Sequence, residues 1–287
     1  MAAKNPDVVV RAAPVTGAAQ PRPRPRTAGD RLRAWNGRGI GLLAVVALIG
    51  AWQWYGSSYP NALYLFSTPS TVLSAFGHEV RTMQLPRAFG ESLGEEMIGF
   101  AIASVVAIVV GVLMGRLKYV EYTLDPLVTL GIATPVVVLL PVFEDWFGAG
   151  YVVRVAFIAT LSVWPLLVNT WMGVRNMSAT YELVGRAFKL SWMQRLYKVV
   201  FPAAAPYIFA GLRLSLAMAT LGMVLAGQEV GDAGLGGLTE VFGQQGAVGP
   251  LVATIVSATV LALLLFGLIR VCERRFFPWI HDMSAEG

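Results

Sequence analysis

Five basic side chains lie close together in a short polar segment between two long apolar stretches. They are Arg175, Arg186, Lys189, Arg195 and Lys198. Guanidinium and ammonium groups are costly to place in hydrocarbon, so this segment must lie outside any bilayer that the flanking stretches occupy. The chemistry available to such a segment is recognition of a partner rather than catalysis.

Apolar residues recur at helical spacing beside these basic positions. Val184, Ala187, Phe188 and Leu190 follow the pattern that places side chains on one face of a helix. The segment is therefore predicted to form a short amphipathic helix that is presented to a partner protein inside the cell.

A second set of polar residues lies within the apolar stretches themselves. The candidates for lining a path through the membrane are Thr134, Asn169, Arg213, Ser215 and Thr220. For the hydroxyl and amide groups, an ordinary hydrogen bond between helices is the alternative. Arg213 lies eleven residues after Pro202, roughly 16 Å along a helix, so it either extends to the inner interface or lines the path of an anionic solute.

Signatures of enzymes are missing from the sequence. The chain has no G-x-x-x-x-G-K-[ST] phosphate loop, so it does not bind ATP in that manner. Its one cysteine, Cys272, excludes an internal disulfide and a thiolate metal cluster, and its two histidines are far apart. No metal site and no cofactor are predicted. The glycines at 234, 236 and 237 predict a flexible or tightly turning loop.

The composition indicates a membrane protein. Of the 287 residues, 56% are hydrophobic and only 14% are charged, whereas soluble domains are nearer a quarter charged. The sequence pI of about 9.5 does not require a nucleic-acid partner, because the basic residues lie at the ends of apolar stretches.

Six apolar stretches have about the twenty residues that a bilayer core requires. They are residues 40–55, 92–115, 124–143, 151–172, 203–226 and 250–269. Pro135, Pro141 and Pro165 suggest kinks in the third and fourth stretches. Gly111 and Gly115 form a G-x-x-x-G pair that permits close helix packing.

The stretches divide the chain into four parts. Residues 1–36 are expected to be a disordered basic cytoplasmic tail, because they contain few large apolar groups. Residues 37–91 hold the first transmembrane helix and an outer interfacial segment, in which Pro69 begins a short helix. Residues 92–272 form the core with a loop at 173–202, and residues 273–287 form a cytoplasmic C-terminal tail.

The distribution of positive charge predicts the orientation. With the N-terminus inside, 18 of the 22 Lys and Arg residues fall on the inner side, Arg81, Arg87 and Arg154 fall outside, and Arg213 falls within the fifth stretch. Cytoplasmic loops carry an excess of Lys and Arg. Both termini are therefore expected in the cytoplasm.

The chain resembles the integral membrane permease of binding-protein-dependent ABC importers, in the branch that handles sulfonates, taurine and nitrate. The resemblance extends from about Phe66 to the end of the sixth stretch. It is carried by the segments LFSTPSTVLSAF, ESLGEEMIGFAIASVVAIVVGVLMG, LDPLVTLGIATPVVVLLPVFEDWFGAG, VWPLLVNTWMGVRNM and VVFPAAAPYIFAGLRLSL, and by GLGGL at Gly234.

This family has a coupling loop with the pattern E-A-A-x3-G-x9-I-x-L-P. Aligned on Pro202, the chain keeps the spacing but has Leu183 in the glutamate position and Lys189 in the glycine position. The resemblance implies that contact with the ATPase involves Tyr181, Glu182, Leu183, Gly185, Arg186, Phe188, Lys189, Leu190, Ser191, Arg195 and Pro202.

The resemblance implies an all-α integral membrane protein with six transmembrane helices, a type I ABC importer permease fold and a cytoplasmic coupling helix. It implies a bacterial inner membrane, a cytoplasmic ATPase dimer that holds ATP and Mg, an extracytoplasmic solute-binding protein and a second permease copy. A homodimer is favoured over a heterodimer. The chain itself would be a transport subunit, not an enzyme. The alternative is a six-span channel or sensor without an ATPase motor.

Overall fold

The computed structural model describes residues 28–59, 67–178, 181, 183, 187–231 and 234–276, with side chains from Gly39 to Arg275. Every regular element in these ranges is a helix. The all-α fold expected from the sequence is therefore confirmed.

The chain divides into two compact units, residues 1–51 and 52–287. The first unit holds the greater part of α1 (Ala28–Ser58), which contains the first predicted span. Because α1 begins at Ala28, residues 28–36 of the segment predicted to be disordered are helical. The rest of that predicted tail, residues 1–27, lies outside the described residues.

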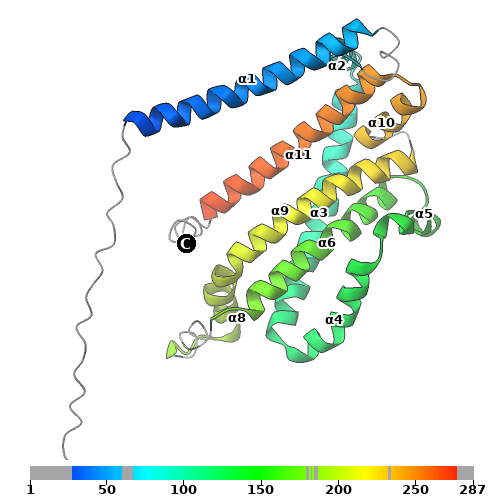
Figure 1. Cartoon of the computed structure of the whole chain (residues 1–287). Coiled ribbons are helices and arrows are strands. Elements are labelled where there is room, and N and C mark those ends of the chain that lie inside the picture. The colour runs from blue at the N-terminus through cyan, green and yellow to red at the C-terminus, as the bar shows by residue number, and fades with distance from the viewer. Residues whose placement is uncertain are drawn as a thin grey trace, which may run out of the picture. The chain divides into compact units, whose positions relative to one another are not determined.

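The second unit contains the remaining helices (Figure 1). They are α2 (Pro69–Arg81), α3 (Gln84–Arg116), α4 (Lys118–Ala133), η2 (Val136–Leu139), α5 (Leu140–Phe147), α6 (Tyr151–Arg175), α8 (Trp192–Arg195), η3 (Leu196–Val200), α9 (Phe201–Val230), α10 (Gly234–Gln244) and α11 (Val248–Phe276). The predicted start of a short helix at Pro69 is confirmed, with Thr68 as its N-cap and Thr71 completing a capping box.

Five described helices are long and apolar enough to cross a membrane, and a bent pair makes a sixth candidate. Four predicted spans lie within α3, α6, α9 and α11. The helices extend beyond the predicted core, since α3 begins at Gln84 and α11 ends at Phe276. α6 continues through Pro165, so that proline does not break the fourth span.

The third predicted span is not one helix. α4 ends at Ala133, and η2 and α5 continue after a bend of 89°. Thr134 is extended, with ψ at 125°, because the ring of Pro135 disfavours the helical conformation in the preceding residue. Pro141 lies in the first turn of α5, where its missing N–H group leaves no helical hydrogen bond unmade. The prediction of a kink at these prolines is confirmed, but a continuous span over 124–143 was wrong.

The centre of the second unit is a layer of three helices, with α6 packed between α3 and α9 (Figure 1). Close approach depends on glycine. A Cβ atom on Gly111 would lie 2.8 Å from Thr170 Cβ, and one on Gly115 would lie 2.6 Å from Val174 Cβ. The predicted packing role of the G-x-x-x-G pair is confirmed, because its neighbours on α6 occupy the space of a side chain.

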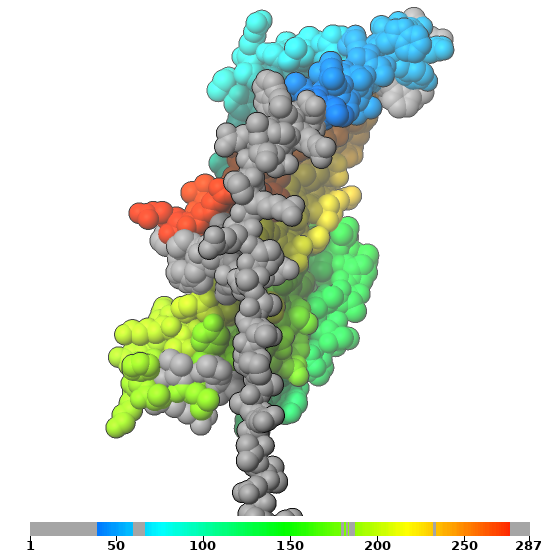
Figure 2. Space-filling view, turned by 60° about the vertical axis from the view of Figure 1, so that its left-hand side comes forward, coloured from blue at the N-terminus to red at the C-terminus, as the bar shows by residue number. Residues whose placement is uncertain are grey.

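The two ends of this unit carry different elements. α2, α5 and α10 lie toward one end, and α8 and the connection from α3 to α4 lie toward the other (Figure 1). In the space-filling view the described part of the 187–200 segment, in yellow-green, is at the end remote from α2, in cyan (Figure 2). The basic segment and the glycine-rich segment are therefore at opposite ends of the helices.

Candidate functional site

Two of the predicted path residues make hydrogen bonds between helices. The hydroxyl of Ser215, fully buried on α9, donates to the carbonyl of Ser162 on α6 at 2.5 Å. The hydroxyl of Thr220 donates to Glu96 Oε1 on α3, also at 2.5 Å. Both hydroxyl groups therefore make the ordinary hydrogen bonds between helices that the sequence analysis gave as the alternative to lining a path.

Thr134 and Asn169 bond to their own helices. Thr134 is exposed, and its hydroxyl donates to the carbonyl of Leu130 at 2.8 Å, at the point where α4 ends. The amide of Asn169 donates to the carbonyl of Pro165 at 2.7 Å. Asn169 also packs against Gly211 on α9, where a Cβ atom would be 2.8 Å from its own.

Arg213 on α9 has an acidic partner. Its Nη1 atom lies 2.6 Å from Glu273 Oε2 on α11, sixty residues further along the chain. The Glu273 side chain is only 4% exposed, whereas that of Arg213 is 44% exposed. The guanidinium therefore neutralises a buried carboxylate while part of it remains accessible.

A row of polar residues on α3 was not among the sequence candidates. Glu91, Ser92, Glu95 and Glu96 follow one another at helical spacing near the start of that helix. The N–H groups of Gly234 and Leu235 donate to Glu91 Oε2 and to Ser92 Oγ, at 3.1 and 2.9 Å. The repeat of polar residues in an apolar helix was a signal that could have identified this row.

The other two members of the row contact α6 and α9. Arg154 on α6 forms an ion pair with Glu95 at 2.8 Å. The charge count placed Arg154 on the outer side, and the structure shows it buried at the start of α6. Glu96 is fully buried, accepts from Thr220, and its Oε2 atom has no hydrogen-bond partner among the described residues.

The glycine-rich segment is helical rather than a loop. It forms α10, and the sequence prediction of a flexible or tightly turning loop was wrong except at Gly234, whose φ is +69°. α10 packs directly on α9, because a Cβ atom on Gly236 would lie 2.5 Å from the carbonyl of Val224. Its first N–H groups are satisfied by α3, which explains how a short helix begins here.

The basic segment is described in part. Glu182, Gly185 and Arg186 lie outside the described residues. Tyr181, Leu183 and Phe188 are exposed by 47%, 64% and 73%. Lys189 has a positive φ of 49°, the conformation that favours glycine. The family pattern places a glycine at this position, so the backbone matches the pattern although the residue does not.

The predicted amphipathic helix does not continue through this segment. The chain turns at Phe188 and Lys189, Leu190 and Ser191 are not helical, and α8 begins at Trp192. Ser191 and Gln194 form a capping box that starts the new helix. α8 then joins α9 through η3, a π-helical stretch of five residues, and Pro202 lies in the first turn of α9.

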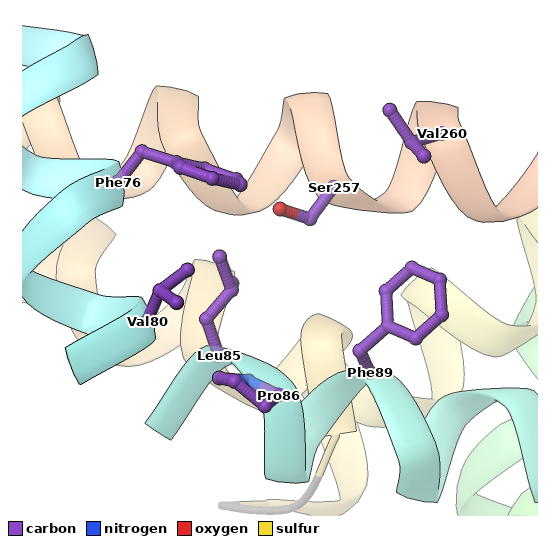
Figure 3. A pocket seen from close by; sticks show the side chains of 7 residues that line it. All are labelled: Phe76, Val80, Leu85, Pro86, Phe89, Ser257 and Val260. Atoms are coloured by element: carbon purple, nitrogen blue, oxygen red, sulfur yellow. The ribbon is translucent and has the colours of Figure 1, made fainter. Parts of the chain in front are cut away.

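Among the described residues of the second unit, two pockets have linings that include none of the five predicted path residues. One, of about 210 Å³, lies between α2, α3 and α11, and Figure 3 shows that it is lined mostly by apolar side chains such as Phe76 and Phe89. Its one hydroxyl, on Ser257, donates to the carbonyl of Ala253. The other, of about 240 Å³, lies between α3 and the α8–α9 segment.

Comparison with known proteins identifies the family. The family described as "Binding-protein-dependent transport system inner membrane component" matches residues 103–278. The putative aliphatic sulfonates transport permease protein of Bacillus subtilis (strain 168) is 29% identical over 268 residues, which cover 92% of this chain and 96% of the relative.

Further relatives and a solved structure agree. The nitrate import permease protein of Synechocystis sp. is 28% identical, and the match covers 84% of this chain and 87% of the relative. The bicarbonate transport system permease protein of Synechococcus elongatus is 32% identical, and the match covers 64% of this chain and 63% of the relative. The fold matches the inward-facing MetNI methionine ABC transporter with a TM-score of 0.55 and 19% identity, over 70% of this chain and 98% of that chain.

The match covers more than half of the chain and includes the last part of α3, all of α6 and α9, the basic segment and α11. Together with the apolar helices, it shows a multi-pass inner membrane protein and favours the permease over a channel or sensor. The chain belongs to the family of binding-protein-dependent transport inner membrane components, and it is a permease subunit of an ABC importer.

Proposed function

We propose that this permease forms the path by which an ATP-driven importer brings a small anionic solute into a bacterial cell. The support is chemical. The named solutes of three relatives are aliphatic sulfonates, nitrate and bicarbonate, which are all anions with negatively charged oxygen atoms. An uptake assay with a sulfonate and its uncharged amide analogue tests this, because equal ATP-dependent uptake of both would contradict an anion-selective path.

The proposed assembly contains two copies of this chain, a cytoplasmic ATPase dimer and an extracytoplasmic solute-binding protein. ATP and Mg are held and ATP is hydrolysed by the partner, since this sequence has no phosphate loop. The mass of the intact complex tests the stoichiometry. Two copies of the 30.9 kDa chain support a homodimer, and one copy beside a different permease refutes it.

The orientation that we propose places both termini in the cytoplasm. The support is the charge distribution, with 18 of 22 Lys and Arg residues on one side. In this orientation the end that carries α8 faces the cytoplasm, where an ATPase binds. The end that carries α2 and α10 faces outward, where a binding protein delivers solute.

The proposed ATPase contact rests on one observation. Large apolar side chains are exposed in the basic segment, although the charges of that segment place it outside the hydrocarbon. Phe188 is 73% exposed and Leu183 is 64% exposed. Burying a phenylalanine against a partner contributes roughly 2 kcal/mol, whereas an exposed charge pair contributes under about 1 kcal/mol. The apolar face is therefore expected to matter more for docking than the charges.

The test compares three alanine variants in proteoliposomes with the purified ATPase. We expect Phe188→Ala to lower ATPase retention and ATP-dependent uptake more than Arg195→Ala does. Tyr119→Ala is the matched control, because Tyr119 is an aromatic residue 89% exposed at the same end of the second unit but outside the segment. Equal, wild-type behaviour of Phe188→Ala and Tyr119→Ala would show that the segment is assigned wrongly.

A further inference from the structure

The pocket of about 240 Å³ between α3 and the α8–α9 segment is a groove with two chemically different parts. Its apolar part is formed by Ile108, Val109, Val112 and Leu113 from α3 and by Phe201 from α9. The part that we call the mouth is lined by Arg116 and by the largely exposed rings of Trp192 and Tyr197. We propose that this groove binds one anionic phospholipid, with an acyl chain along α3 and the headgroup phosphate beside Arg116.

The apolar part of the groove lies at membrane depth. Ile108, Val109, Val112 and Leu113 face one side of α3, which has the highest mean hydropathy of the candidate spans, 2.7. From Ile108 to Arg116 the helix advances roughly 12 Å, at 1.5 Å per residue. A span of this length and hydropathy places the groove in hydrocarbon, which a lipid chain reaches and a partner protein that docks from water does not.

The mouth of the groove has the side chains of a membrane interface. Trp192 and Tyr197 are 60% and 66% exposed, and such amphipathic rings concentrate at the level of lipid headgroups. Arg116 is the one charged residue in the lining, and Arg195 and Lys198 lie on the same short segment as the two aromatic residues. The described lining and residues 192–200 contain these basic residues and no Asp or Glu, which favours an anionic headgroup over a zwitterionic one.

The wall that carries these aromatic residues has an unusual backbone. η3 is a π-helix, and single π-turns are rare and occur frequently at functional sites. Leu196 and Tyr197 from η3 line the groove, while Val199 and Val200 are buried against the bundle. The wider turn thus places two residues of the same short stretch on the groove and two in the core. The proposed orientation decides only which leaflet of the membrane supplies the lipid. The groove itself does not depend on that orientation.

The experiment uses the full-length chain, purified with the subunits that it retains, and native mass spectrometry. Dioleoyl phosphatidylglycerol and dioleoyl phosphatidylcholine are supplied at equal concentration, so only the headgroup differs. We expect wild type to retain phosphatidylglycerol in preference. Losing one basic residue near an anionic headgroup corresponds to about a fivefold change, so Arg116→Gln should reduce the preference about fivefold.

Two further variants separate this site from general attraction. Val109→Trp should reduce retention of both lipids by filling the apolar part without removing charge, since Val109 is 53% exposed and does not belong to the buried core. Arg270→Gln, which removes an exposed arginine from the inner end of α11, should leave the preference unchanged.

Several outcomes would overturn the proposal. They are no preference for phosphatidylglycerol in wild type, an equal loss in Arg270→Gln, or retention that glycerol phosphate competes away without the acyl chains. Displacement of the lipid by the ATPase would show instead that the groove is a protein-docking surface. None of these results depends on transport, so they leave the proposed import function to its own test.

Discussion

The guanidinium of Arg154 on α6 holds the carboxylate of Glu95 on α3, with both Nε and Nη2 at 2.8 Å from the same oxygen. The two side chains are 10% and 3% exposed, so water screens the contact little. The pair fixes the start of α6 against α3 at the end of the bundle where α10 also bonds to α3. The pair is thus part of the contact among α3, α6 and α10.

Removing one member of this pair should destabilise the protein strongly. Arg154→Met or Glu95→Leu leaves a buried charge without its partner, which costs about 3–5 kcal/mol. The double variant should be more stable than either single variant. Thermal unfolding of the detergent-purified chain measures this, and a double variant that shows the full sum of both losses would disprove the coupling.

The exposed pair on the same helix provides the control. Arg87 and Glu91 are 3.0 Å apart, with side chains 82% and 37% exposed. Arg87→Met should change stability by less than about 1 kcal/mol, because solvent screens exposed pairs.

A second prediction concerns the packing of α3 on α6. Gly111→Ala places a Cβ atom 2.8 Å from Thr170 Cβ and 2.9 Å from the carbonyl of Leu167. The carbonyl belongs to the backbone of α6 and cannot rotate away, so we expect a loss of about 1–3 kcal/mol in unfolding free energy. Gly94→Ala is the control on the same helix, where nothing lies within 4 Å. Equal unfolding midpoints for both variants would contradict this account.

A third prediction isolates the backbone conformation of Lys189. A side chain in the left-handed region costs roughly 1–2 kcal/mol, which glycine avoids. Lys189→Gly and Lys189→Gln both remove the charge, but only the first relieves the backbone. We therefore expect the glycine variant to be about 1–2 kcal/mol more stable to unfolding than the glutamine variant, by denaturant titration of the detergent-purified chain. Equal stabilities would mean that residue 189 does not keep this backbone conformation in solution.

A fourth prediction tests the orientation in a Cys272→Ser background. Cysteines in place of the exposed residues Asp145 and Gln245 should react with an impermeant thiol reagent added to intact cells. Tyr119 lies at the start of α4, at the opposite end of the second unit from these two positions. A cysteine in its place should react only after permeabilisation. The opposite labelling pattern would reverse the topology and remove the proposed cytoplasmic contact.

Features set by neighbouring residues were predictable from the sequence. The lengths of the apolar stretches located the candidate spans, and Pro69 marked the start of α2. The kink at Pro135 was also expected, but the 89° angle was not, because it depends on how η2 and α5 pack. The break before α8 followed from Ser191 and Gln194, a local capping signal that the spacing of apolar residues concealed.

Contacts between distant residues could not be predicted. Glu95 and Arg154 are 59 positions apart, and Arg213 and Glu273 are 60 apart. A charged residue in an apolar helix indicates that some partner exists, but many pairings satisfy that need equally. The packed helices select one, since α6 brings the guanidinium of Arg154 to Glu95 on the polar side of α3. The assignment of the coupling segment to ATPase contact stays a prediction for all of its residues, and Glu182, Gly185 and Arg186 lie outside the described residues.

The π-helical turn of η3 has a consequence for how this protein tolerates insertions and deletions. Each residue advances an α-helix by about 100° around its axis, whereas a π-turn takes up one extra residue within nearly one turn. Deleting one residue from η3 and closing the turn into a regular α-helix would therefore leave Phe188 and α8 facing nearly the same direction relative to α9. The same deletion in the regular part of α9 would rotate everything before it by about 100°. A change of length by one residue is in this sense tolerated in this five-residue stretch and not in the helix that follows it.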